Sequence, residues 1–270
     1  MALDLTGVNA KVSRAKEHTQ SVKDEVAAWM NTRPCSLTPK ANADFTRWAL
    51  IISVPKTADL VRWTLIVGDT INNLRSALDH LIYAIAVHES GSNPPPDEKR
   101  LAFPICDTPG EFKDAAKRIK SLTPDVRAVV ESVQPYNRTH PMLPALLAIL
   151  RDFNNTDKHK LLRLAYAATS SGDVSLTWKG NRSEQPMPLV PVEFNGGELK
   201  DGAEVMAVTF DRPAPDVECH FDVMVIIALW HGGKAGVIPR IDRDDFAAIL
   251  ALLTEEVEAV IKLIVAAVKV

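Results

Sequence analysis

IVGDTINNLRSALDHLIYAI, residues Ile66–Ile85, is the segment around which the rest of this chain can be organised. Plotted at 100° per residue, its side chains separate into an apolar arc and a polar arc, which predicts one long amphipathic helix from Ala58 to about His88. The apolar arc, which we expect to pack into the core, contains Ile66, Val67, Ile71, Leu74, Ala77, Leu78, Leu81, Ile82 and Ile85. The polar arc contains Asp69, Asn72, Asn73, Arg75, Ser76, Asp79, His80 and Tyr83.

The polar arc is made of side chains that disfavour a helix. No Lys, Glu or Gln occurs between Ile66 and Val87, although these residues favour helices and fill most solvated helix faces. Asn, Asp and Ser take their place, and their short side chains compete with the hydrogen bonds of the helical backbone. Such an arc needs another reason to exist, and two are available.

In the first explanation other elements cover the arc and its groups satisfy one another, with Arg75 and Asp79 paired at i,i+4 spacing. In the second explanation the arc lines a binding site. Arg75 would then supply a fixed cationic fork, His80 a proton-transfer group near neutral pH, and Asn72 or Asn73 a group that orients a ligand.

A second segment, LRDFNNTDKHKLL from Leu150 to Leu162, uses the same residue types. If it is helical, His159 lies on its polar side and Asp157 falls among the apolar residues. A buried carboxylate needs a partner, so we expect the two helices to pack with Asp157 against Arg75 or His80. The alternatives are that Asp157 caps a frayed helix end and that His159 is a plain surface residue.

The remaining elements follow from periodicity and from breakers such as the three prolines of residues 94–96. Further helices are expected over residues 6–30, 110–120, 124–133, 143–161 and 242–268. Strands are expected over residues 49–54, 174–178, 189–194, 203–210 and 221–227. The pattern predicts an α+β protein with a helical centre, an antiparallel β-sheet of about four or more strands and a long C-terminal helix.

We expect residues 1–270 to form a single fused unit, because no linker separates the helical part from the strands that follow. A division into a mainly helical part, residues 1–162, and a sheet with the last helix, residues 163–270, is the alternative. The last helix is apolar on more than one stripe, which suits either a central core helix or a contact in a homodimer.

The bulk composition excludes several classes of protein. The 270 residues are 46% hydrophobic and carry a formal net charge of −3, which argues against coating of duplex nucleic acid by overall charge. The N-terminus lacks the apolar run of a signal peptide, and charged residues interrupt the apolar C-terminal segment, so we expect a cytoplasmic protein that does not span a membrane. Basic residues gather locally at Lys113, Lys117, Arg118, Lys120 and Arg127.

No cofactor or metal motif stands out. The cysteines, Cys35, Cys106 and Cys219, have neither zinc spacing nor a disulfide framework, and we expect buried or half-buried thiols. A metal site could draw on Asp79, His80, Asp157 and His159, but no HExxH spacing occurs. We therefore expect no cofactor and no metal, with a metal-dependent hydrolase as the third hypothesis.

The run GD…NLRSALDH from Gly68 to His80, with later FPI (residues 103–105), QPY (residues 134–136) and DKH (residues 157–159), resembles a widespread set of uncharacterised bacterial proteins. The resemblance covers roughly residues 60–162. In addition, Arg75-x4-His80 is similar to the R-x(4–6)-H signature of HEPN-type domains, many of which are metal-independent endoribonucleases.

The HEPN resemblance implies that Arg75 stabilises the charge of a scissile phosphate and that His80 is the general acid or base, often across a dimer. Asn72, Asp79 and Asp157 would support them, and RNA would run along the basic patch. The competing hypothesis is a non-enzymatic module that binds a small ligand or a protein and whose Asp, Asn, Arg and His cluster is a structural network.

Overall fold

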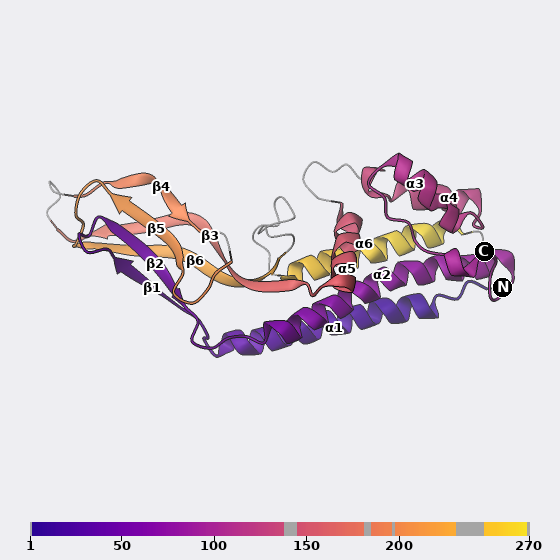
Figure 1. Ribbon diagram of the computed structural model, residues 1–270, viewed down its shortest axis with the longest axis horizontal. Helices are drawn as coiled ribbons and strands as arrows, with labels where there is room; N and C mark the ends of the chain where they lie inside the picture. The colour runs from indigo at the N-terminus through magenta and orange to yellow at the C-terminus, as the bar shows by residue number, and fades with distance from the viewer. Residues whose placement is uncertain (1, 138–144, 181–184, 196–197, 231–245, 269–270) are drawn as a thin grey trace.

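The computed structural model describes residues 2–137, 145–180, 185–195, 198–230 and 246–268 and has an elongated shape (Figure 1). The helices lie at one end of the long axis and most of the strands at the other. The α-helices are α1 (Thr6–Asn31), α2 (Leu60–Ser90), α3 (Pro109–Ala115), α4 (Pro124–Ser132), α5 (Leu146–His159) and α6 (Phe246–Ala267). The strands are β1 (Ser36–Ala41), β2 (Arg47–Ser53), β3 (Arg163–Trp178), β4 (Pro188–Phe194), β5 (Glu204–Phe210) and β6 (Val217–Trp230). The predicted α+β class is confirmed.

Helix α2 is the long amphipathic helix expected from the sequence. At its start the Asp59 side chain accepts a hydrogen bond of 3.0 Å from the backbone N–H of Arg62, which satisfies one of the free amides of the first turn. At its end Gly91 adopts a left-handed conformation, with φ of +68°, and its N–H donates to Val87 O at 2.9 Å. Glycine suits this position because it has no Cβ to clash.

The apolar arc of α2 forms the centre of the core, as predicted. Ile71, Leu74, Leu78 and Ile85 are all fully buried, and α1, α5 and α6 pack around the helix. Helix α6 contacts α1, α2, α4 and α5 of its own chain, and its buried side chains run along its whole length. The structure therefore places α6 in the core, and a contact of α6 in a homodimer stays a prediction. Within the described residues, no helix combines the length and the apolar character needed to cross a membrane.

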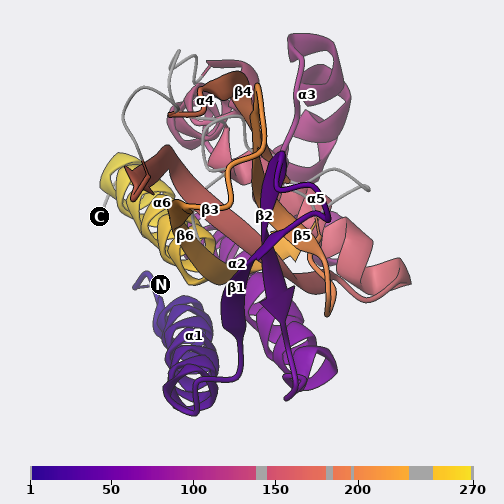
Figure 2. The same cartoon turned by 90° about the vertical axis from the view of Figure 1, so that its left-hand side faces the viewer.

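The strands do not form one sheet from the four runs after residue 163. Strands β4 and β5 join the two earlier strands in an antiparallel sheet of order β1-β2-β5-β4, whereas β3 and β6 pair with each other as a long two-stranded ribbon. Figure 2 looks from the β end, with β1 and β2 in front of the helices. The sequence pattern missed β1 because this edge strand contains Pro39 and Lys40, residues that break the alternation of a buried strand.

A small aromatic contact joins the helical part to the ribbon. The rings of Trp29 on α1 and Tyr166 on β3 stack with centroids 5.7 Å apart. The Tyr166 hydroxyl oxygen accepts a hydrogen bond of 2.7 Å from the backbone N–H of Ala58, just before α2. The start of α2 is therefore held by the ribbon as well as by its own cap.

Candidate functional site

Two residues of the polar arc, Arg75 and Asp79, hold a neighbouring loop. Arg75 Nη2 donates a hydrogen bond of 2.7 Å to the backbone carbonyl oxygen of Phe103 and lies 3.1 Å from Asp79 Oδ1. Asp79 Oδ1 in turn accepts a hydrogen bond of 2.8 Å from the backbone N–H of Phe103. Both backbone polar groups of a fully buried residue are thus satisfied by side chains of α2. We call this arrangement of Arg75, Asp79 and Phe103 the Phe103 clamp.

Gln134, which follows α4, binds the next backbone groups of the same loop through its side chain. Its Oε1 accepts a hydrogen bond of 2.9 Å from the N–H of Cys106, and its Nε2 donates to the carbonyl oxygens of Pro104 and Val130, each at 2.9 Å. Residues 103–106 are therefore attached to α2 and α4 through side chains. The FPI motif supplies backbone groups of this attachment, and the QPY motif supplies the Gln134 side chain. Both motifs therefore have a structural role.

The environment of Arg75 is that of a buried structural cation. Burial lowers the pKa of Arg75, and the charge of Asp79 opposes that effect; a guanidinium nonetheless stays protonated in proteins. Among the described residues, Arg75 Nη1 is buried without a hydrogen-bond partner. Nη2 is already engaged by Phe103 and Asp79, and the Arg75 side chain is only 15% exposed.

The carboxylate of Asp157 lies against Gly68 on α2. A Cβ atom added to Gly68 would sit 2.5 Å from Asp157 Oδ1 and 2.8 Å from Oδ2, far inside van der Waals contact. The expected meeting of Asp157 with Arg75 or His80 is therefore wrong. The side chain is short, and it can approach α2 closely only where the facing residue has no side chain, which is two turns before Arg75.

This position is electrostatically unfavourable for a charged carboxylate. Burial raises the pKa of Asp157, and the neighbouring carboxylate of Asp69 raises it further. Within the described part of the chain, no Lys, Arg or His forms an ion pair with Asp157. The Gly68–Asp157 contact is thus a packing contact between α2 and α5, and it accounts for the glycine within the helix.

His80 lies on the other side of α2 and lines a pocket. Its ring packs against the second residue of α1, because a Cβ added to Gly7 would lie 2.9 Å from His80 Nδ1. The pocket has a volume of about 580 Å³, which is within the usual range for small-molecule sites. Its lining residues are Ala2, Asp4, Gly7, Val8, Asp79, His80, Tyr83, Ala84, Val87, Asn93 and Leu101. We call it the His80 pocket.

The polar groups of the His80 pocket come from three segments. The Tyr83 hydroxyl donates a hydrogen bond of 3.0 Å to Asn93 Oδ1, which ties α2 to the loop after it. Asp4 Oδ1 accepts a hydrogen bond of 2.9 Å from the N–H of Thr6 at the start of α1, and this contact lowers the pKa of Asp4. The sequence identified Tyr83 only as a member of the polar arc, and it contained no signal for Asp4 or Asn93.

The other predicted site residues do not join His80. Asn73 receives a hydrogen bond of 3.3 Å from Lys11 Nζ and donates one of 2.8 Å to the carbonyl oxygen of Asp69. Asn72 is exposed on α2, and His159 is exposed at the end of α5. Among the described residues, no three His, Cys, Asp or Glu side chains are placed to hold one metal ion. The predicted cluster therefore divides into the Phe103 clamp, the Gly68–Asp157 contact and the His80 pocket.

Four residues of the predicted basic patch, Lys113, Lys117, Arg118 and Lys120, are exposed, whereas Arg127 is half-buried, and acidic neighbours partly compensate the charge. Lys117 pairs with Asp114 at 3.2 Å, and Lys120 pairs with Asp97 at 3.1 Å. The cysteines match expectation, since Cys106 and Cys219 are buried and Cys35 is half-buried.

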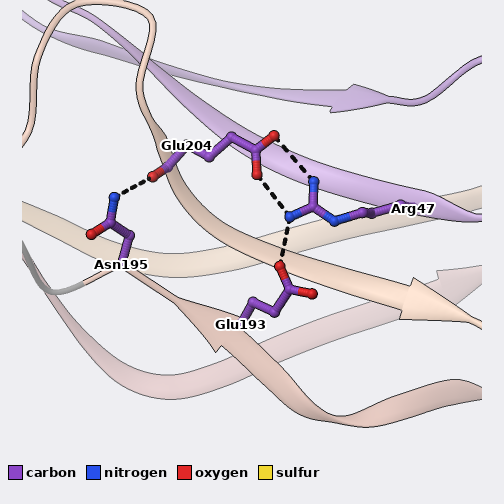
Figure 3. Close-up of polar contacts among 4 residues, drawn as sticks. All are labelled: Arg47, Glu193, Asn195 and Glu204. Carbon is purple, nitrogen blue, oxygen red and sulfur yellow. Dashed lines mark hydrogen bonds and ion pairs between the residues drawn. The ribbon is translucent and has the colours of Figure 1, made fainter.

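A second hollow lies on the four-stranded sheet, lined by residues of β1, β2 and β5, and its Arg47 is already paired. Arg47 on β2 donates to both carboxylate oxygens of Glu204, at 3.1 and 2.7 Å, and to Glu193 at 2.6 Å (Figure 3). The three side chains link β2, β5 and β4. Because two carboxylates already bind Arg47, this hollow offers a ligand fewer available polar side chains than the His80 pocket.

No protein-family model, curated protein or solved structure matches the chain.

Proposed function

We propose that this chain is a non-enzymatic binding protein that takes a small organic ligand in the His80 pocket. The observation that carries the proposal is the division of the polar arc. Arg75 and Asp79 hold the backbone of Phe103, whereas His80 is exposed and lines a pocket with Tyr83. A pocket with an apolar floor and a few converging polar groups is the usual form of a small-molecule site.

The apolar part of the pocket supports the same proposal. Val8 is buried beneath the pocket, and Val87 and Leu101 add further hydrocarbon surface. An apolar body of a ligand would displace water from these groups, while Tyr83 and His80 would orient it. Removal of apolar surface from water is the main favourable term in such binding.

The experiment is a small-molecule fragment screen by ligand-observed NMR against the wild type and three variants of the full chain. Fragments that bind the wild type should lose binding in His80→Ala. They should keep it in His159→Ala, which removes an exposed histidine outside the pocket. A filling variant, Ala84→Phe, should also abolish binding because it occupies the pocket without removing a polar group. A screen in which no fragment depends on His80 or on Ala84 would refute the proposal.

The ribonuclease hypothesis stays a prediction, and the geometry favours it less. Arg75 and His80 are five residues apart on one helix and therefore point about 140° apart around its axis. Asp4 and Asp79 also line the pocket beside His80, and carboxylates repel a phosphate backbone. The test is cleavage of RNA by the wild type and by His80→Ala, each with and without a chelator. Cleavage that requires His80 and ignores the chelator would support the ribonuclease instead.

A further inference from the structure

The charge and hydrogen-bonding character of the His80 pocket restrict what it can bind. None of its lining residues, all of which are described, is Lys or Arg, and two of them, Asp4 and Asp79, are acidic. The hydrogen bond from Thr6 lowers the pKa of Asp4 and so favours its ionised form. The lining therefore contains two carboxylates and no Lys or Arg; Arg75, outside the lining, balances the charge of Asp79, so Asp4 supplies the uncompensated negative charge.

Asp79 lines the pocket and also belongs to the Phe103 clamp. Its described contacts, with Arg75 and with the N–H of Phe103, are both made by Oδ1. An ionised carboxylate has two oxygens and about four acceptor positions, so these contacts leave acceptor capacity on Asp79. The side chain is 37% exposed, which allows that capacity to face the pocket.

The remaining polar groups offer acceptors together with the Nδ2 donors of Asn93. The Tyr83 hydroxyl gives its proton to Asn93, which leaves the phenol oxygen to accept from a ligand. A neutral imidazole at His80 carries one acceptor nitrogen. A ligand that desolvates the carboxylates and the phenol oxygen has to supply N–H or O–H donors, because polar groups buried without a partner are costly.

We infer that the His80 pocket selects a small organic amine, with its cationic nitrogen near Asp4 and Asp79 and its apolar body against Val8 and Leu101. This inference rests on the proposed function and names the ligand class of the same site. The ring of Tyr83 strengthens the selection, since the face of an aromatic ring attracts a cation. An anionic ligand of the same shape would meet the carboxylates and be repelled.

The test uses three ligands with one indole scaffold and different charges: tryptamine (cationic), tryptophol (neutral) and indole-3-acetate (anionic). Each is titrated into the isotope-labelled full chain, and the amide signals of Gly7, His80 and Ala84 are followed by NMR. We expect tryptamine to bind at least about threefold more tightly than tryptophol, the order of effect of a partly exposed ion pair. We expect indole-3-acetate to bind most weakly.

Two variants isolate the charge. Asp4→Asn removes the negative charge but keeps a side-chain oxygen that can accept the hydrogen bond from the N–H of Thr6. It should reduce the advantage of tryptamine over tryptophol. Asp24→Asn, at an exposed position on α1 outside the pocket, should leave the advantage unchanged.

The outcomes separate the two proposals. If tryptophol or indole-3-acetate moves the pocket signals as strongly as tryptamine does, the amine inference fails and the pocket still binds a ligand. If the three compounds leave the signals unmoved, the amine inference also fails, and the fragment screen alone decides the proposed function. An advantage for tryptamine that Asp24→Asn removes as well as Asp4→Asn would show a non-specific charge effect and would equally overturn the inference.

Discussion

Gly68→Ala tests the close approach of α5 to α2. In a solvated helix interior, replacing Gly with Ala stabilises by about 1 kcal/mol. Here the new Cβ would lie 2.5 Å from Asp157 Oδ1 and 2.9 Å from its Cγ. The carboxylate would have to move away, and overpacking of this kind costs about 1–3 kcal/mol. The two effects oppose each other, so we expect the single variant to be between neutral and about 2 kcal/mol less stable.

A double-mutant cycle separates the two effects. With Asp157→Ala as background the obstructing atoms are gone, and Gly68→Ala should then stabilise by about 1 kcal/mol. The coupling energy of the cycle equals the cost of the clash, about 1–3 kcal/mol. The measurement is the free energy of unfolding from urea titrations of the four forms, followed by circular dichroism and by tryptophan fluorescence to check for two-state behaviour.

Gly110→Ala is the matched control. Gly110 lies in α3, and an added Cβ would have only Thr108 Oγ1 near it, at 3.9 Å. This substitution should be neutral or stabilising to the same degree with Asp157 present or absent. The reasoning is refuted if Gly68→Ala stabilises the wild type by about 1 kcal/mol and the coupling energy stays below about 0.5 kcal/mol.

Three further variants test the other contacts. Arg75→Met removes the donor to Phe103 and should lower the free energy of unfolding by about 1–3 kcal/mol, whereas an unchanged urea midpoint would contradict a structural role. Gly7→Ala places a Cβ 2.9 Å from His80 Nδ1, so it should shift the imidazole NMR signals and weaken fragment binding without loss of stability; unmoved signals would count against the contact. Burial raises the pKa of Asp157 in the folded protein above its unfolded value of about 3.9. The protonated carboxyl therefore favours folding below the unfolded pKa, and this contribution to stability is lost as pH rises through the folded pKa. Asp157→Asn should therefore raise stability at pH 7, by less than about 1 kcal/mol, and a pH titration showing equal or lower stability would exclude this account.

The helical part of the fold follows from the sequence because its signals are local. The 3.6-residue period of the apolar arc and the prolines of residues 94–96 are such signals; they predict a helix over residues 58–88, and the structure has α2 from Leu60 to Ser90. The pairing of strands is not local. β2 joins β5 across more than 150 residues, and no periodicity within either run identifies the partner.

The candidate site was predictable in its residue types and not in its geometry. Short polar side chains at Asp79 and Asp157 correctly indicated groups with a role other than solvation. Their partners, however, are a backbone segment at Phe103 and a glycine at position 68. Every residue except proline has a backbone N–H, so the sequence does not show which N–H binds a given side chain. A glycine indicates only that another group can approach the backbone closely. Glycine lowers the stability of a helix interior, so Gly68 was the residue from which a close approach to α2 could have been predicted.

The structural and binding roles of the polar arc are physically connected through one short loop. Leu101 lines the His80 pocket and lies two residues before Phe103, whose backbone Arg75 and Asp79 hold in place. The Phe103 clamp therefore positions one wall of the pocket, and Asp79 belongs to both. It follows that Arg75→Met should weaken fragment binding although Arg75 itself does not line the pocket. Binding that survives in a folded Arg75→Met protein would show that the clamp and the pocket are independent.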